Sequence, residues 1–344
     1  GLLSRQAARP IKTFTIGFDD GHADELRFAR IAAKHFGTDH TEALLRPDRI
    51  GLVGQFATHF GEPFGDSSAL PMWLVSQVAR QSVTVALSGD GGDELFAGYT
   101  WAHRNLQVAK YRHVPRILRY PVHALLACLP GSPSINKIRR FSADSFLTPQ
   151  ESFRRRLTCF SPKMRTALYA PDFKPGAAQD PYLEHYRDAG DMSDANRMLY
   201  LDTAMYLPDD ILTKVDRMSM AHGLEARVPL LDHRLVEFAA TVPFALKYAG
   251  GVSKRLAKHA MRDLLPPELL VQRKQGFSIP IHRWFREDLR EHFQETVLSP
   301  GARCHTFLRE DQLATLLHSH TTNQEDLGHH LWTVLVFEHW LRQR

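Results

Sequence analysis

Apolar and polar positions follow two different periods in the first hundred residues. Lys12–Phe18 is a short run of β-branched and aromatic residues, which predicts a strand. His22–Phe36 repeats apolar residues at helical spacing and is followed by Gly37, which predicts a helix with a glycine at its C-cap. A strand followed directly by an amphipathic helix is the first half of a βαβ unit.

The same alternation continues up to about residue 105. The pattern predicts a strand at His40–Leu45, helices at Arg49–Phe60 and Ser68–Gln81, and a strand at Val83–Leu87. Because Val83–Leu87 is almost wholly apolar, we expect it to be buried on both faces of a parallel sheet. Strands separated by helices predict an α/β fold with a doubly wound parallel sheet.

From about Leu106 onward helical periodicity dominates. We therefore divide the chain into an α/β core at 1–105, a basic helical region at 106–195 and a second helical part at 196–344.

Charge is distributed unevenly along the chain. The whole sequence carries 43 Lys and Arg against 38 Asp and Glu, but Arg104–Arg165 holds thirteen basic residues and only two acidic ones, Asp144 and Glu151. A solvated helical face explains such a block, and so does an anionic partner. Zinc-finger spacing and RRM-type aromatic motifs are absent from the sequence, which argues against nucleic acid as that partner.

Cysteine usage and hydropathy narrow the class of protein further. Cys128, Cys159 and Cys304 are widely separated and form no CxxC motif, which argues against a disulfide framework or a cysteine zinc site and favours a reducing cytoplasm. No apolar run reaches the ~18 residues that span a bilayer, so we expect no membrane partner.

Candidate chemistry follows the strand predicted at Val83–Leu87. The loop Ser88–Glu94 (SGDGGDE) combines three glycines with three carboxylates. Glycines allow backbone N–H groups to approach a phosphate closely, and carboxylates beside a polyanion require a bridging cation, which points to a nucleotide with Mg²⁺. A polar turn before an N-capped helix explains the same residues, and the loop alone does not decide between these two interpretations.

Two further stretches of the sequence contain charged residues that are candidates for a polar site. At 206–232, Asp209 or Asp210 is placed to cap a helix with Asp210, Lys214 and Arg217 on one face. The acidic and basic side chains that follow predict a buried polar network; they are Glu225, Arg227 and Asp232. Lys274 precedes a glycine that can turn the chain inward, and Lys254 lies 20 residues upstream.

Six motifs in one order resemble the asparagine synthetases, specifically the C-terminal synthetase domain of the glutamine-hydrolysing class. They are TFTIGF (13–18), EPFGDSS (62–68), SGDGGDELFAGY (88–99), YLPDDILTKVDRMSM (206–220), GLEARVPLLDH (223–233) and RKQGFSIP (273–280). The resemblance implies an ATP-pyrophosphatase-type fold in which the helical part completes the active site. It also implies that ATP adenylates the side-chain carboxylate of aspartate and that ammonia then displaces AMP.

The resemblance implies roles for individual residues. Ile16 matches the residue whose backbone contacts adenine, and Ser88 and Gly89 match the pair that contacts AMP. Asp93 matches a carboxylate that holds Mg²⁺ on the pyrophosphate. Lys254 and Lys274 match cations that bind phosphate oxygens. Asp90 stands where well-known members carry Glu, and it is a candidate base for ammonium.

Two parts of the family pattern are missing from this sequence. The signature Ser-Gly-Gly-x-Asp-Ser, which should precede TFTIGF, is absent, so we expect an N-terminally truncated chain without the first strand of its sheet and inactive alone. The glutaminase domain that supplies ammonia is absent as well. Gly1–Ala8 resembles the tail of the helix after the missing signature.

Other functions remain open at this point. A sibling amidotransferase would use the same adenylation chemistry on another carboxylate, as β-lactam synthetases and polysaccharide-tailoring enzymes do, and Asp90 and the basic block favour it. A non-catalytic scaffold on the same fold is the third interpretation. The acceptor, the ammonia route and a homodimeric state are not decided by the sequence.

Overall fold

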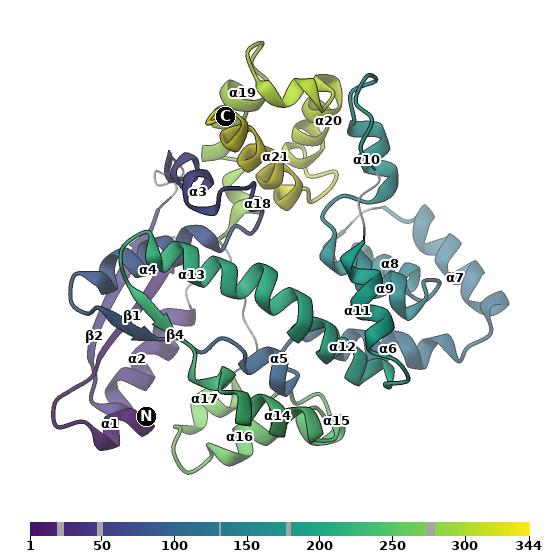
Figure 1. Ribbon diagram of the computed structural model, residues 1–344. Coiled ribbons are helices and arrows are strands. Elements are labelled where there is room, and N and C mark those ends of the chain that lie inside the picture. The colour runs from purple at the N-terminus through teal and green to yellow at the C-terminus, as the bar shows by residue number, and fades with distance from the viewer. Residues whose placement is uncertain (19–23, 47–50, 131, 177–179, 273–278) are drawn as a thin grey trace.

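The computed structural model describes residues 1–18, 24–46, 51–130, 132–176, 180–272 and 279–344 (Figure 1). Helices make up most of these residues, and the strands form small parallel sheets. The chain is thus mixed α/β, as its sequence predicts.

The first sheet pairs β1 (Lys12–Phe18) with β2 (Asp39–Leu45), after a short helix α1 (Leu2–Gln6). The two strands are parallel, in register from Lys12 opposite Asp39 to Phe18 opposite Leu45, and α2 (Asp24–Phe36) connects them. Gly37 follows α2 with φ +62°, the left-handed conformation expected of a C-cap glycine. Both predicted strands and the helix between them are confirmed, and residues 47–50, where the next helix was expected to begin, lie outside the described residues.

Helices α3 (Val53–Phe60) and α4 (Ala69–Arg80) extend the core from this sheet. Phe56 and Trp73 bring their ring centroids to 5.3 Å. Both belong to one large cluster with Ile16 of β1 and with the helices at the C-terminal end of the chain. These contacts tie the first and last quarters of the chain together.

The second sheet pairs β3 (Val85–Leu87) with β4 (Glu225–Arg227), again in parallel. In the described residues it is separate from the first sheet, so a single doubly wound sheet is not observed. The expectation that this strand is buried on both faces is wrong, because Val85 is 37% and Leu87 56% exposed. The short two-stranded sheet seen in the described part of the chain does not extend far enough for flanking elements to cover β3.

A run of helices follows β3 and forms the middle part of the molecule (Figure 1). Three of them begin with a side-chain cap followed by proline, at Ser132, Thr148 and Ser161, where proline loses no helical hydrogen bond. The helices are α5 (Gly92–Phe96), α6 (Thr100–Arg112), α7 (Arg116–Cys128), α8 (Pro133–Asp144), α9 (Pro149–Leu157), α10 (Pro162–Leu168) and α11 (Pro181–Asp188).

A continuous helical rod crosses the molecule from this middle part to the two sheets (Figure 1). It consists of α12 (Asp194–Leu201), a π-helical segment η2 (Asp202–Leu212) and α13 (Thr213–Met220). The prediction of a helix capped at Asp209 or Asp210 is therefore wrong, because both residues lie inside the rod. Pro208 also lies in η2; it lacks an N–H donor, which is one cause of an irregular helix.

The remaining helices return over the sheets and close the core. Helix α21 buries most of its apolar residues together with Glu338. The helices that return over the sheets are η3 (Pro229–Leu231), α14 (His233–Thr241), α15 (Phe244–Lys247), α16 (Arg255–Ala260), α17 (Pro267–Val271), α18 (Ile281–Trp284), α19 (Asp288–Val297), η4 (Arg303–Thr306), α20 (Glu310–Thr321) and α21 (Gly328–Leu341).

Two expectations about the chain's environment can be compared with the structure. The cysteines Cys128, Cys159 and Cys304 are all free thiols. Among the described residues, no helix combines the length and the hydropathy needed to cross a bilayer.

Candidate active site

The glycine-rich loop leaves the carboxyl end of β3 and leads into α5. Gly91 has φ +83°, and a Cβ atom at this position would lie 2.7 Å from Cγ of Leu231. Both the backbone conformation and the contact therefore require glycine. Ser88 donates its hydroxyl hydrogen to the carboxylate of Asp90, which fixes the two side chains relative to each other.

Asp93 and Lys254, which are far apart in the sequence, meet beside this loop. The Lys254 Nζ lies 3.0 Å from Oδ1 of Asp93. The backbone holds Lys254 there, because its N–H donates to the carbonyl of Phe96 at 3.2 Å and its φ is +52°. A non-glycine residue in the left-handed region is uncommon and needs such support from its surroundings.

The other predicted site residues differ in how the structure places them. Ile16 is buried, 1% exposed, and lies on β1 in the first sheet, whereas the loop follows β3 in the second. Gly89 is open to its surroundings, since a Cβ atom there would meet nothing within 4 Å. Lys274 lies outside the described residues.

A largely buried ion pair that sequence reasoning missed joins the segment before α4 to the helical rod. The Lys214 Nζ, on α13, lies 2.6 Å from Oδ2 of Asp66 and donates to Oγ of Ser68 at 2.7 Å. Burial opposes ionisation of Asp66, but the Lys214 ammonium and the hydrogen bonds from Ser68 together outweigh it and hold the pKa of the carboxyl below its ordinary value.

Asp210 adds a second carboxyl to this ion pair. Burial, with the like charge of Asp66 as the next cause, raises the pKa of Asp210 to about 7. The neighbouring Tyr206 hydroxyl also has a raised pKa, because it is buried and faces Asp210 and Asp66. Partial burial beside Asp66 therefore disfavours the ionised form of Asp210.

A second buried polar group extends from α5 to the π-helical segment. Tyr99 donates its hydroxyl hydrogen to Glu94, and its ring stacks on Trp101 with centroids 3.6 Å apart. The Trp101 Nε1 donates to Asp202 at 3.1 Å, and Arg156 pairs with the same carboxylate. Burial raises the pKa of Asp202 to about 6 although Arg156 acts in the opposite direction.

The charged residues expected on one helix face separate in the structure. Lys214 is buried against Asp66, whereas Arg217 on the same helix is exposed. The buried network predicted downstream is also wrong, because Glu225 and Arg227 pair with each other on the surface at 2.7 Å. Asp232 instead caps α14 through the N–H of Arg234. The sequence segment that supplies the partners of Lys214 is EPFGDSS, in which Asp66 and Ser68 lie two residues apart.

The donor atoms near the loop fit one mode of magnesium binding. Among the described residues there is no cluster of three or more His, Cys, Asp or Glu side chains that could enclose a metal by itself. Mg²⁺ commonly keeps several waters and takes only one or two protein carboxylates together with substrate phosphates. Asp93 is such a carboxylate, at the start of α5 and beside a cation that suits a phosphate.

The chain is a mixed α/β protein with a glycine-rich loop after a parallel strand, and comparison with known proteins identifies its family. The family model for asparagine synthase matches residues 1–342, so the chain belongs to the asparagine synthase family. It is 29% identical to the glutamine-hydrolysing asparagine synthetase 1 of Bacillus subtilis over 96% of this chain and 52% of that protein. It is also 25% identical to the human glutamine-hydrolysing asparagine synthetase over 86% of this chain and 39% of that protein. The chain thus spans about half the length of the curated relatives it matches.

Proposed function

We propose that this chain is the synthetase part of a glutamine-dependent asparagine synthetase. In this reaction, ATP activates the side-chain carboxylate of aspartate, and ammonia then converts it into the amide. The observation that carries the proposal is the 3.0 Å contact between Asp93 and Lys254 beside a glycine-rich loop. This contact supports the proposal because binding a nucleoside triphosphate with Mg²⁺ requires a carboxylate for the metal and a cation for the phosphates close together.

The proposed roles of the loop and its neighbours follow from the chemistry of each group. Ser88 and Gly89 would contact the AMP portion of ATP, where Gly89 leaves the backbone accessible. The backbone of Ile16 would contact the adenine. Asp93 would hold Mg²⁺, which supplies charge neutralisation on the pyrophosphate when bound, while Lys254 and Lys274 would bind phosphate oxygens.

The reaction divides into two substitutions. An oxygen of the aspartate β-carboxylate attacks the α-phosphorus of ATP and the bond to pyrophosphate breaks, which gives β-aspartyl-AMP. The nitrogen of ammonia then attacks the acyl carbon, AMP leaves with the bonding electron pair, and the proton that the nitrogen must lose to form the amide passes to the departing phosphate. Asp90, oriented by Ser88, would accept the proton that ammonium loses before the attack.

We further propose that the chain acts together with an N-terminal segment that contains a glutaminase domain. Support comes from β1 and β3, which in the described part of the chain lie in separate two-stranded sheets and are each paired with a strand on one side only. The chain alone would then be poorly active, and the glutaminase half would supply ammonia. A cytoplasmic location suits the three free thiols, and a homodimer is compatible with this arrangement.

Pyrophosphate release with ATP, Mg²⁺, aspartate and ammonium tests the activity. We expect little turnover from residues 1–344 and substantial turnover once an N-terminal segment such as that of the relatives is joined to them. In that longer protein, Lys254→Ala should lower the rate by about 10²-fold, the scale of one lost preorganised charge contact, while the neighbouring surface variant Arg255→Ala should not. Full activity of Lys254→Ala would remove this residue from the site.

A sibling amidotransferase with another acceptor is the second candidate. Asp90 favours it, because an aspartate replaces the glutamate of well-known family members at this position. A panel of carboxylates in the same assay separates the two: release with another acid but not with aspartate would select the sibling activity. A longer protein that binds no ATP would instead indicate a non-catalytic scaffold.

A further inference from the structure

A small cavity lies among four helices of the middle part, where α6, α9, α11 and α12 come together (Figure 1). Its volume is about 60 Å³, which is room for about four to six water molecules. Exposed Pro149 and Asp194 line one side, so the cavity is open to solvent there. The rest of the wall is mainly apolar and includes Leu106, Val108, Ala109, Phe153, Met198 and Leu201.

Most polar side chains in this wall are engaged with protein groups. The Asn105 amide donates to Sδ of Met198 at 2.9 Å. Arg197 donates to the carbonyl of Gly190 at 2.6 Å and to the Tyr186 hydroxyl at 3.2 Å. Its guanidinium also lies 4.8 Å from the centre of the Tyr186 ring. These contacts fix the two side chains and use their main donors within the protein.

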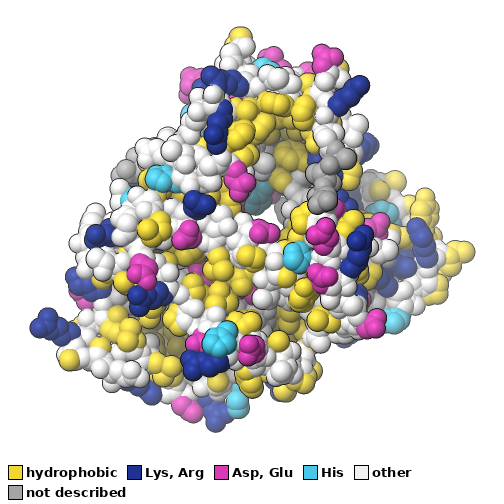
Figure 2. Space-filling view, viewed as in Figure 1, with side chains coloured by type: hydrophobic (Ala, Val, Ile, Leu, Met, Phe, Trp, Pro, Cys, Tyr) yellow, Lys and Arg dark blue, Asp and Glu magenta, His cyan; other side chains and the backbone are white. Residues whose placement is uncertain are grey.

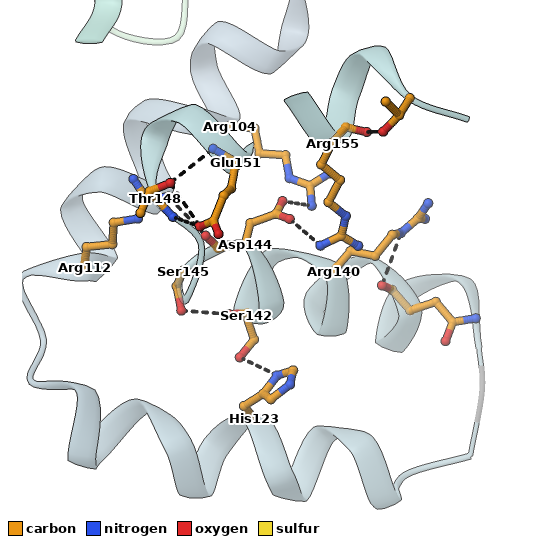
Figure 3. A network of polar contacts seen from close by, with 12 residues as sticks. Arg104, Arg112, His123, Arg140, Ser142, Asp144, Ser145, Thr148, Glu151 and Arg155 are labelled. Atoms are coloured by element: carbon orange, nitrogen blue, oxygen red, sulfur yellow. Dashed lines mark hydrogen bonds and ion pairs between the residues drawn. The ribbon is translucent and has the colours of Figure 1, made fainter. Parts of the chain in front are cut away.

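Arg112, the last residue of α6, differs from the other polar residues of the wall. Its one hydrogen bond among the described residues runs from Nη2 to the backbone carbonyl of Asp144, at 3.1 Å (Figure 3). The Asp144 carboxylate is occupied by Arg104 and Arg155. The Nε of Arg112 is buried without a hydrogen-bond partner in the described part of the chain, and burial lowers the pKa of the guanidinium. The cavity wall therefore contains a partly desolvated cation with spare donors.

The charge that selects a ligand here is local to Arg112. Over the helices of the middle part, Lys and Arg side chains are mixed with Asp and Glu side chains (Figure 2). A guanidinium holds a carboxylate through two parallel N–H donors, and ligand sites commonly combine an apolar wall with a few such orienting groups. A phosphate group fits less well, because its second charge would lie against apolar side chains.

We propose that this cavity binds a small aliphatic carboxylate, with its hydrocarbon part against Leu106 and Phe153 and its carboxylate on Arg112. A short fatty acid and a free amino acid with an aliphatic side chain share this chemistry. Asp194 discriminates between them, because its side chain is 60% exposed and is available to the ammonium group of an amino acid. The cavity shares no residue with the glycine-rich loop, so this inference does not rest on the proposed function.

Saturation-transfer NMR on the whole chain tests the inference with isovalerate and with valine, which adds an amino group to the same carbon skeleton. We expect saturable binding of isovalerate and at least about tenfold weaker binding of the uncharged isovaleramide. Arg112→Gln should weaken isovalerate binding at least about tenfold, because it removes the cation and keeps an amide donor. The matched control is Lys110→Gln, which removes an exposed charge from the same helix outside the cavity and should bind as the wild type does.

Ala195→Leu fills the cavity from α12 and should abolish binding, and it decides the question if Arg112→Gln does not fold. Tighter binding of valine than of isovalerate, with the difference lost in Asp194→Asn, would identify the ligand as a free amino acid, and equal or weaker binding of valine would identify a fatty acid. The inference is overturned if neither compound binds saturably up to about 10 mM. Unchanged affinity in Arg112→Gln or in Ala195→Leu, or equal affinity for isovaleramide, would overturn it as well.

Discussion

Gly98 packs directly against Asp93. A Cβ atom on Gly98 would lie 2.7 Å from Cγ of Asp93 and would also collide with Cε of Lys254. The contact between Asp93 and Lys254 therefore exists only because residue 98 has no side chain. This requirement comes from contact with other side chains, since the backbone of Gly98 is outside the left-handed region.

The substitution Gly98→Ala should consequently disturb the candidate site. We expect a loss of about 1–3 kcal/mol in the free energy of unfolding, the usual result of overpacking, and weaker binding of ATP. Urea unfolding and calorimetric titration with ATP and Mg²⁺ measure the two effects. The control is Gly54→Ala on α3, where the new Cβ meets its nearest atom at 3.6 Å and should stabilise the helix. A Gly98→Ala variant that unfolds and binds as the wild type does would contradict this description.

Lys214 should be far more important for stability than its helix neighbour Arg217. Replacing Lys214 by Met leaves the partly buried Asp66 without its cation and close to Asp210, so we expect a loss of up to about 3 kcal/mol, the lower end of the cost of breaking a fully buried pair. Arg217→Met removes an exposed charge and should change stability by no more than about 0.5 kcal/mol. Urea unfolding of the two variants gives the comparison, and equal stabilities would rule out a buried ion pair.

Asp66→Asn in the Lys214→Met background provides a further check. This change removes the unpaired carboxylate, so the double variant should recover part of the lost stability. A double variant less stable than Lys214→Met would mean that Asp66 has other favourable partners that outweigh the ion pair.

Glu338 on α21 is another buried charge, and its carboxylate binds the start of η4. It accepts hydrogen bonds from the backbone N–H groups of Cys304 and Arg303, at 2.8 and 3.2 Å, and from Arg342 at 2.7 Å. Glu338→Ala would leave these donors unpaired and should cost about 3–5 kcal/mol of stability by urea unfolding. Exposed Glu295→Ala on α19 is the control, and a Glu338→Ala variant as stable as this control would contradict the assigned role.

Local features of the sequence were sufficient for much of the α/β part. Lys12–Phe18 and Asp39–Leu45 combine β-branched or apolar residues with flanking helices of clear periodicity, so neighbouring residues alone determine their conformation. Val85–Leu87 was also recognised as a strand, but its burial was predicted wrongly. Burial depends on which strands and helices lie beside it, and these come from distant parts of the chain.

The candidate site also has features that the local sequence predicts and features that depend on distant residues. Ser88–Asp93 could be recognised because glycines and carboxylates stand next to each other, whereas the pairing of Lys214 with Asp66 joins residues 148 positions apart. The π-helical segment η2 added a second difficulty, because it shifts the faces of the residues that follow it. Lys214 and Arg217 both follow η2 in the regular helix α13, so their different exposure comes instead from the contact of Lys214 with Asp66, which helical spacing does not reveal.

Asp210 should make the stability of the protein fall as the pH rises toward neutrality. Its pKa is about 7 in the folded protein and near 3.8 when unfolded, so between these values the folded state holds a proton that the unfolded state has released. The contribution of Asp210 to the free energy of unfolding should decrease by up to about 1.4 kcal/mol per pH unit in this window and stay constant above it.

Several histidines act in the opposite direction, so the effect of Asp210 must be measured as a difference in stability between two proteins. Desolvation lowers the pKa of buried His320 and of the partly buried His330 and His339, and their contribution to stability is lost as the pH falls below about 6.5. Asp210→Asn leaves these groups in place. Urea unfolding at intervals from pH 4.5 to pH 8 should show the variant gaining stability over the wild type as the pH rises, because the wild-type carboxyl must ionise beside Asp66. A difference that does not change with pH would mean that Asp210 is already ionised throughout this range and that Lys214 serves both carboxylates.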